Sequence, residues 1–109
     1  MIKMNVADMF NIKLAKCGGM HLGGKLKAVA DGANIPCVIG SMIESSLGSL
    51  ANYNFATAYE MKVGGLSAFQ MITNDYDFGL KIENGKLIRD KELPGLGYPD
   101  EKVLEKEFE

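Results

Sequence analysis

The chain has 109 residues, of which 47% are hydrophobic and 24% are charged, and its formal net charge is −2 at pH 7. This composition supports a folded core and does not indicate disorder. The absence of a basic run argues against nucleic-acid binding, and the apolar stretches are far shorter than the ~20 residues that span a bilayer. We therefore expect one small cytoplasmic domain with no nucleic-acid or membrane partner.

The chain holds two cysteines, Cys17 and Cys37, and one histidine, His21, with no CxxC pair. These residues argue against a zinc cluster. Free buried thiols are the expectation, because cysteine is among the residues most often buried, although the spacing by itself leaves a disulfide open. His21 has no evident partner in the sequence and is expected on a surface or loop.

Short β-like runs alternate with helical stretches along the first part of the chain. The first strand is expected at residues 10–15, before the Gly18-Gly19 pair. A helix should follow and end near Gly32 and Asn34, which are typical C-terminal residues. Its predicted apolar face has the spacing of one side of a helix. This face consists of Leu22, Leu26, Val29, Ala30 and Ala33.

The wholly apolar run at residues 36–40 predicts a strand buried on both faces, as in parallel sheets covered by helices. Ser45 or Ser46 can cap the helix that follows. The Gly64-Gly65 pair is expected to end this helical unit, and residues 66–72 are expected to form a third strand. The predicted apolar face of the second helix consists of Leu47, Leu50, Ala51, Phe55 and Ala58.

The pattern changes at residue 74, where a tail segment is expected to begin with a polar turn. Asn84-Gly85 between two β-like runs is a strong signal for a hairpin. A further turn is expected at Pro94-Gly95-Leu96-Gly97, and a short charged helix is expected from Asp100 to Phe108.

The order strand, helix, strand, helix, strand predicts parallel strands joined by right-handed crossovers. Three parallel strands would leave two sheet edges unpaired. This points to strands supplied from elsewhere or to self-association.

Two charged side chains could carry chemistry. Lys13 lies in the first strand-like run, where it could simply point outward, or it could lie at the carboxyl end of the strand and act as a base. Glu44 follows the second buried strand and would then lie at the same rim. Spacing alone favours a simpler interpretation of Glu44, as a solvated acid stabilised by the dipole of the next helix. The glycine pairs near residues 18–24 match no phosphate-binding motif and are expected to serve a loop and helix packing.

Three blocks of sequence are more specific than these spacings. Residues 11–19 (NIKLAKCGG) resemble the sixth-strand motif of muconate-cycloisomerase-like enzymes, and residues 40–48 (GSMIESSLG) resemble their seventh-strand motif. Residues 84–87 (NGKL), followed by PGLG and Asp100, resemble the family's C-terminal segment. The chain is therefore similar to the C-terminal barrel domain of the enolase superfamily, in the mandelate racemase/muconate lactonizing enzyme group.

The resemblance implies an α/β fold, the C-terminal portion of a (β/α)₈ TIM barrel. Strands six to eight and their helices would occupy residues 1–73, and residues 74–109 would form the hairpin-containing tail. Members of the family bind Mg²⁺ through three acids on strands three to five, and a lysine removes the α-proton of a carboxylate substrate as the metal stabilises the enolate. By the same resemblance Lys13 is the catalytic acid/base, and Ser41, Met42 and Glu44 bind substrate.

The chain also departs from the family. The Asp-Glu pair of the fifth strand and the Lys-x-Lys of the second strand are absent, so the Mg²⁺ ligands are missing and the chain is expected to be inactive alone. Gly65 and Ser67 fall where many members carry an acid on the eighth strand, which argues against a dipeptide epimerase and leaves cycloisomerases, racemases and dehydratases open. The alternative is a non-catalytic truncated product, stabilised as a homo-oligomer or by a partner fragment that completes the barrel.

Overall fold

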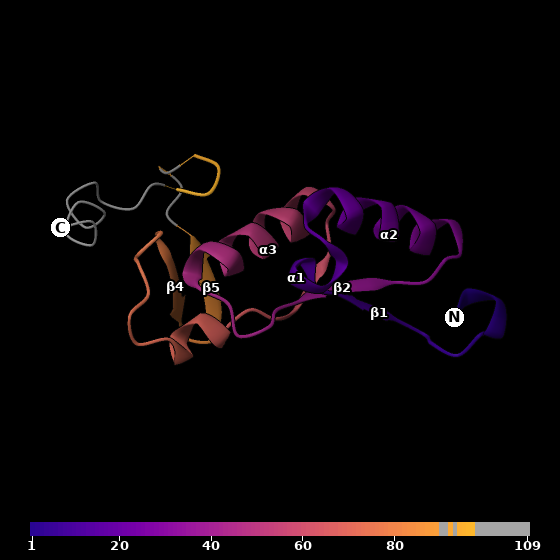
Figure 1. The fold of residues 1–109 in the computed structure, drawn as a ribbon, viewed down its shortest axis with the longest axis horizontal. Coiled ribbons are helices and arrows are strands. Elements are labelled where there is room, and N and C mark those ends of the chain that lie inside the picture. Colours follow the sequence, from indigo (N-terminus) through magenta and orange to yellow (C-terminus); the bar gives the residue numbers. More distant parts are fainter. Residues whose placement is uncertain (90–91, 93, 98–109) are drawn as a thin grey trace.

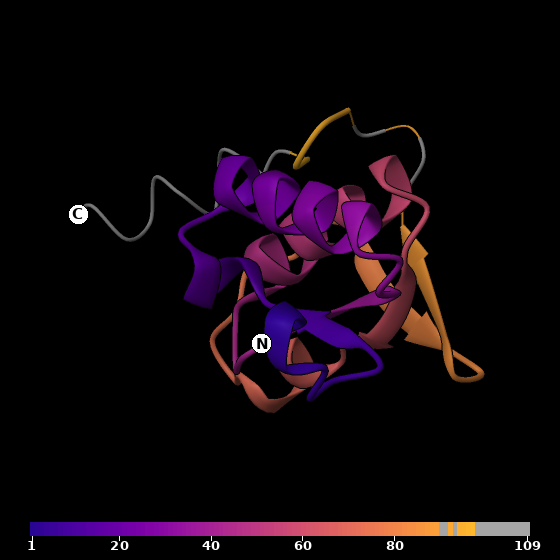
Figure 2. The ribbon, with the colours of Figure 1, turned by 90° about the vertical axis from the view of Figure 1, so that its right-hand side faces the viewer.

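The computed structural model describes residues 1–89, 92 and 94–97. Its main body is a parallel three-stranded sheet in the order β1-β2-β3. The strands are β1 (Phe10–Ile12), β2 (Cys37–Gly40) and β3 (Lys62–Gly65). The helices between them are α1 (Leu14–Cys17), α2 (Met20–Gly32) and α3 (Ser46–Ala58), and the 3₁₀ turns are η1 (Ile2–Met4) and η2 (Ala68–Met71). Figures 1 and 2 show α2 and α3 on the same face of the sheet, which confirms the predicted alternation of strands and helices.

The first strand is shorter than predicted, since β1 ends at Ile12 and α1 takes up the remainder of the expected run. The turn forms at Lys13, whose carbonyl accepts from Lys16 N at 2.9 Å and from Cys17 N at 3.0 Å. Gly18, with φ of 88°, then ends α1 in a left-handed conformation that glycine adopts without steric cost. The prediction of a strand through residue 15 is wrong because these hydrogen bonds compete with a continued strand.

The third strand was predicted four residues too late. Gly64 and Gly65 lie inside β3 instead of ending the helical unit, and residues 66–72 form a connection that includes η2. A Cβ on Gly64 would lie 3.2 Å from the backbone oxygen of Ile39 and would crowd the neighbouring strand. The glycine pair therefore lies where β3 comes close to β2. The apolar run after the pair is not a strand, and its first residue, Leu66, is buried.

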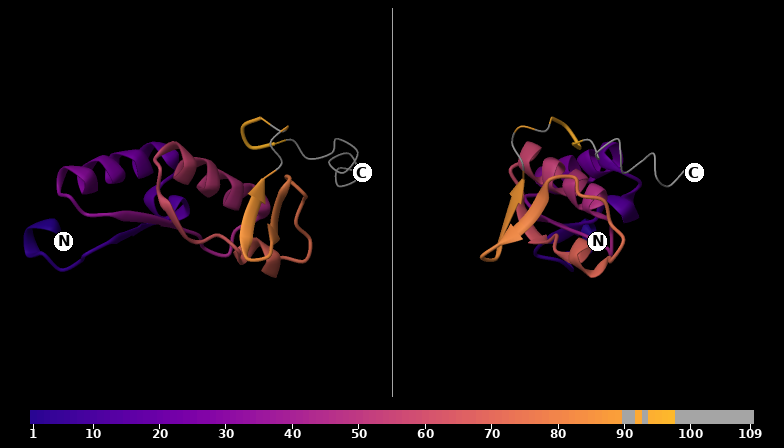
Figure 3. Two further views of the ribbon diagram at one scale, coloured as in Figure 1. Left: turned by 180° about the vertical axis from the view of Figure 1, so that it is seen from behind. Right: turned by 90° about the vertical axis from the view of Figure 1, so that its left-hand side faces the viewer.

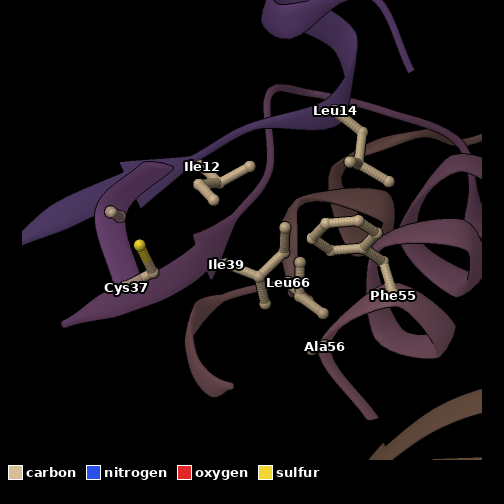
Figure 4. Packing of buried hydrophobic residues seen from close by; sticks show 8 residues of the cluster. Ile12, Leu14, Cys37, Ile39, Phe55, Ala56 and Leu66 are labelled. Atoms are coloured by element: carbon tan, nitrogen blue, oxygen red, sulfur yellow. The ribbon is translucent and has the colours of Figure 1, made fainter. Parts of the chain in front are cut away.

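The main core lies between the sheet and its two covering helices (Figure 4). Ile12 and Ile39 point toward the helices and are 5% and 0% exposed, because alternate residues of a strand face opposite sides. Phe55 of α3 packs against them from the helix side. On the other side of the sheet, Asn11 and Lys62 are exposed.

The apolar face predicted for α2 is mostly exposed, so the prediction that it packs against the core is wrong. Leu22, Leu26 and Val29 are 44%, 50% and 58% exposed, and Ala30 is the member of the stripe that is fully buried. The helix packs instead through Gly23, where a Cβ would lie 2.8 Å from Leu14 Cδ2 and 3.2 Å from Phe55 Cζ. The larger apolar side chains face outward because no described element covers α2 on that side.

The prediction for α3 is partly right. Ser45 caps the helix, and its hydroxyl accepts from Gly48 N at 3.3 Å. Leu50 and Phe55 are buried, whereas Leu47 is 37% exposed and Ala58 is exposed. Two polar residues, Ser49 and Asn52, are each 0% exposed, which the apolar pattern did not indicate.

The tail contains the predicted hairpin, formed by β4 (Leu80–Glu83) and β5 (Lys86–Arg89). Asn84 and Gly85 have φ of 51° and 73°, as the tight turn between two twisted strands requires. Figure 3 shows the hairpin at the end of the molecule away from the N-terminus. The turn at residues 94–97 is also present, with Gly97 N donating to Pro94 O at 3.0 Å. The helix predicted from Asp100 lies outside the described residues.

Both cysteines are free thiols, Cys37 buried and Cys17 half-buried. Burial raises the pKa of the Cys37 thiol, and the charges of Lys27 and Asp31 act on it in opposite directions to a smaller extent. No helix in the described part of the chain is both long enough and apolar enough to cross a membrane.

Candidate functional site

The predicted site residues follow the carboxyl ends of two neighbouring strands. Lys13 comes directly after β1, and Ser41, Met42 and Glu44 come after β2. Because β1 and β2 are parallel and paired, their carboxyl ends meet at one edge of the sheet. The structure therefore brings the four residues to one rim, which we call the β1–β2 rim.

Lys13 lies at the start of α1 with an extended backbone, φ −128° and ψ 111°. Its side chain is half-buried, and Nζ lies 3.9 Å from the sulfur of Met42. A surface depression along the free edge of β1 is lined by Lys13, Asn11 and Leu26 among others. Lys13 thus contacts one other predicted site residue and borders open space.

Ser41 ties the rim to the third strand. Its backbone N–H and its hydroxyl both donate to the carbonyl oxygen of Gly65, at 3.0 Å and 3.1 Å. This pair of hydrogen bonds fixes the first residue after β2 against the last residue of β3. The hydroxyl is therefore already engaged with the protein backbone.

Glu44 is also engaged rather than simply solvated. Its Oε1 accepts from the backbone N–H of Met42 at 3.0 Å, and its Oε2 accepts from Asn52 Nδ2 at 2.5 Å. The side chain is half-buried and lines a depression between the start of α2 and the first turns of α3. Glu44 thus links the loop that follows β2 to α3 through hydrogen bonds to Met42 and Asn52.

The structure does not join Lys13 directly to Glu44. No ion pair connects them, and they line separate depressions. The connection between them runs through Met42, which contacts Lys13 through its sulfur and Glu44 through its backbone N–H.

Two residues that position the rim were missed in the sequence. Asn52 holds Glu44, and it could have been found only as a polar residue on the buried side of a predicted helix. Asp75 accepts from the backbone N–H of Ser46 and so satisfies a donor at the start of α3. Ser46 and Asp75 are 29 positions apart, and no local sequence signal links them.

The described residues do not fit a Mg²⁺ site. Among them, no three or more His, Cys, Asp or Glu side chains come together as a cation would require. At the rim itself, both oxygens of Glu44 accept hydrogen bonds from N–H groups.

Comparison with known proteins gives consistent matches over most of the chain. Residues 1–101 match the family described as "Enolase C-terminal domain-like". The chain is 36% identical over 98 residues to an L-amino acid-D/L-Glu epimerase of Francisella philomiragia, which covers 89% of the chain and 28% of that protein. It is 38% identical over 96 residues to an N-succinyl-L-Arg/Lys racemase of Bacillus cereus, covering 88% of the chain and 26% of that protein.

The fold is similar to solved members of the same group. Against the crystal structure of the Bacillus cereus N-succinyl Arg/Lys racemase the TM-score is 0.79 with 36% identity, over 96% of this chain and 28% of that one. Against the muconate lactonizing enzyme of Pseudomonas putida the TM-score is 0.75 with 26% identity, over 96% of this chain and 30% of that one. The predicted fold class, the C-terminal portion of a TIM barrel, is confirmed. The chain belongs to the enolase C-terminal domain-like family and spans little more than a quarter of the length of the curated relatives that it matches.

Proposed function

We propose that this chain supplies the acid/base lysine and part of the substrate-binding rim of an enolase-superfamily enzyme that removes the α-proton of a carboxylate substrate. The observation that carries the proposal is the position of Lys13. It follows β1 directly, at the edge of the sheet where (β/α)₈ enzymes carry their active sites, and it borders open space beside the strand. An amine placed there can reach a substrate that lies over the carboxyl ends of the strands.

In this proposal Lys13 takes the α-proton through Nζ and can return it, as a general base and then a general acid. Met42 lies against the lysine and would limit where its ammonium can point. Ser41 and Glu44 would shape the substrate-binding rim by fixing the loop after β2 to β3 and to α3. Because the polar groups of Ser41 and Glu44 are already hydrogen-bonded, we assign Glu44 an orienting role rather than a proton-transfer role.

The reaction type within the family remains a prediction. Two relatives are named as an L-amino acid-D/L-Glu epimerase and as an N-succinyl-L-Arg/Lys racemase. At the end of β3, Gly65 and Ser67 provide no carboxylate that could bind an ammonium group of a substrate. This favours a racemase of N-acylated amino acids over a dipeptide epimerase.

We propose that the Mg²⁺ expected for the family is held by residues other than those described here, and that the chain is inactive alone. The proposal is tested in a chimera in which residues 1–101 replace the matched segment of the Bacillus cereus racemase. Exchange of the substrate α-proton for solvent deuterium is followed by NMR for each enantiomer of an N-succinyl amino acid.

We expect the chimera to exchange the α-proton and Lys13→Ala to slow that exchange by about 10²-fold or more on one face. Lys16→Ala is the matched control, since Lys16 lies on the same turn and is exposed. Normal exchange on both faces in the Lys13→Ala chimera would show that the lysine has no catalytic role.

A second proposal is favoured by a different observation. Within residues 1–89, β1 and β3 each pair on one side only, and α2 exposes Leu22, Leu26 and Val29. A non-catalytic chain held in a homo-oligomer, or by a fragment that completes the barrel, would cover both features. Light scattering coupled to size-exclusion chromatography tests it, and a stable monomer that unfolds cooperatively would contradict it.

A further inference from the structure

Asn52 is a buried polar residue whose contacts converge on the β1–β2 rim. Its side chain is 0% exposed in the second turn of α3. The two hydrogens of the amide go to two acceptors, with Nδ2 donating to Glu44 Oε2 at 2.5 Å and to Gly48 O at 3.0 Å. The carboxylate bond is charge-assisted, and bonds of this kind are stronger than those between neutral groups.

Among the described residues, the amide oxygen of Asn52 has no hydrogen-bond partner, although it is buried. Leaving a buried acceptor unsatisfied is unfavourable, and an apolar side chain of similar size such as leucine would avoid this cost. The residue is therefore not explained by helix stability. What asparagine provides here, and leucine cannot, is a donor aimed at Glu44.

The surrounding backbone leaves room for this contact. A Cβ on Gly48 would lie 3.1 Å from Glu44 Cβ and 3.3 Å from Glu44 Oε2, closer than most Cβ contacts. Glycine at this position lets the glutamate side chain lie along the first turn of α3 and reach Asn52. Two residues of α3 thus accommodate the Glu44 carboxylate: Asn52 donates a hydrogen bond to it, and Gly48 leaves space for it.

From Glu44 the contacts continue to the lysine. Glu44 Oε1 accepts from Met42 N at 3.0 Å, and the sulfur of Met42 lies 3.9 Å from Lys13 Nζ. A continuous set of contacts therefore runs from the interior of α3 to the end of β1. The last step, between Met42 and Lys13, joins residues that are 29 positions apart in the sequence.

We propose that Asn52 is a positioning residue for the rim: it fixes Glu44, which fixes the backbone of Met42, which places the thioether against the Lys13 ammonium. The proposal rests on the proposed function, because the position of Met42 matters to turnover only if Lys13 transfers a proton. The contact between Asn52 and Glu44 can nevertheless be tested without any activity.

The first measurement uses the 109-residue chain. Hydrogen exchange of the Met42 backbone amide is followed by NMR in the parent chain, in Asn52→Leu and in Ser49→Ala. Ser49 is the matched control, because it is also 0% exposed on α3 and its hydroxyl has no hydrogen-bond partner in the described part of the chain. We expect Asn52→Leu to speed exchange of the Met42 amide about tenfold or more and Ser49→Ala to leave it unchanged.

The second measurement uses the chimera described above. Asn52→Leu should lower kcat for α-proton exchange about tenfold, since the lysine is misplaced. Asn52→Ala, which removes the donor without adding bulk, should do the same and replaces Asn52→Leu if the leucine variant does not fold. Ser49→Ala should retain the parent kcat.

The outcomes separate the two proposals. If Lys13→Ala is fully active while Asn52→Leu still frees the Met42 amide, the proposed function fails and the structural contact stands. If Lys13→Ala is inactive while both Asn52 variants keep the parent kcat, the positioning role of Asn52 is overturned. An unchanged Met42 amide in both Asn52 variants would likewise overturn it.

Discussion

The helices α2 and α3 lie on the same face of the sheet and are both 13 residues long, yet they differ sharply in burial. In α2 only Gly23 and Ala30 are buried. In α3 six residues are buried, namely Ser46, Ser49, Leu50, Asn52, Phe55 and Ala56. Both helices carry a predicted apolar stripe, so the stripe alone does not determine how much of a helix becomes buried.

The difference lies in the number of neighbours. Phe55 of α3 joins the core between the sheet and the helices, and Leu50 of the same helix joins a second cluster with Phe78 and Leu80 from the tail. α3 is therefore covered from two sides, whereas α2 contacts the sheet on one side and leaves Leu26 exposed on the other. An apolar face contributes to stability only where another element covers it.

The largest expected effect tests this contrast directly. Leu50→Ala should lower the free energy of unfolding by about 2–5 kcal/mol, because it removes a fully buried side chain and leaves a cavity. Leu26→Ala should change it by less than about 0.5 kcal/mol, since Leu26 is half exposed. Chemical denaturation monitored by circular dichroism measures both. A large, concentration-dependent loss in Leu26→Ala would break the comparison and support self-association through α2.

A smaller effect is expected where α2 does meet its neighbours. Gly23→Leu should destabilise the fold by about 1–3 kcal/mol, because its side chain would collide with Leu14 and Phe55. Gly32→Leu is the matched control on the same helix, and nothing lies within 4 Å of a Cβ at that position. Thermal denaturation of the two variants gives the difference. Equal stability of the two would mean that α2 does not pack on α3 as described.

The smallest effect concerns the thiol beneath α2. Because burial raises the pKa of Cys37 in the folded chain, the folded state holds its proton more tightly than the unfolded state does. The associated stability is complete below the ordinary thiol pKa of about 8.5 and is lost as the pH rises through the folded value. Cys37→Ala should remove this alkaline fall in the free energy of unfolding.

Cys17→Ala, which keeps Cys37, should retain the alkaline fall. Denaturant titrations of both variants between neutral and alkaline pH check the prediction. If the free energy of unfolding falls by the same amount in Cys37→Ala, other groups cause the fall. The pH dependence would then no longer support the burial of Cys37, the first residue of β2, under α2.

Features set by short-range chemistry were predicted well. The hairpin follows from Asn84 and Gly85, which accept positive φ, and the start of α3 follows from the capping hydroxyl of Ser45. The strand before Lys13 was predicted too, although its end at Ile12 was not, since the expected run continued to residue 15. The catalytic role of Lys13 and the substrate-binding roles of Ser41, Met42 and Glu44 stay predictions, as does the division of the chain near residue 73.

Features that depend on distant contacts were not predicted. The third strand was misplaced because residues 66–72 are mainly apolar, whereas Lys62, Val63 and Gly65 are the residues that pair with β2. The capping of α3 by Asp75 and the bracing of Glu44 by Asn52 join positions that no periodicity relates.

The sequence by itself determined the order of strands and helices, the caps and turns, and the family motifs, because these depend on residue types and on neighbours within a few positions. Only the tertiary structure decided which apolar faces are buried, where the third strand pairs and how the rim is held. Those outcomes depend on which segments approach one another in space, and a hydrogen bond such as that between Asn52 and Glu44 forms only once α3 has been placed against the loop after β2.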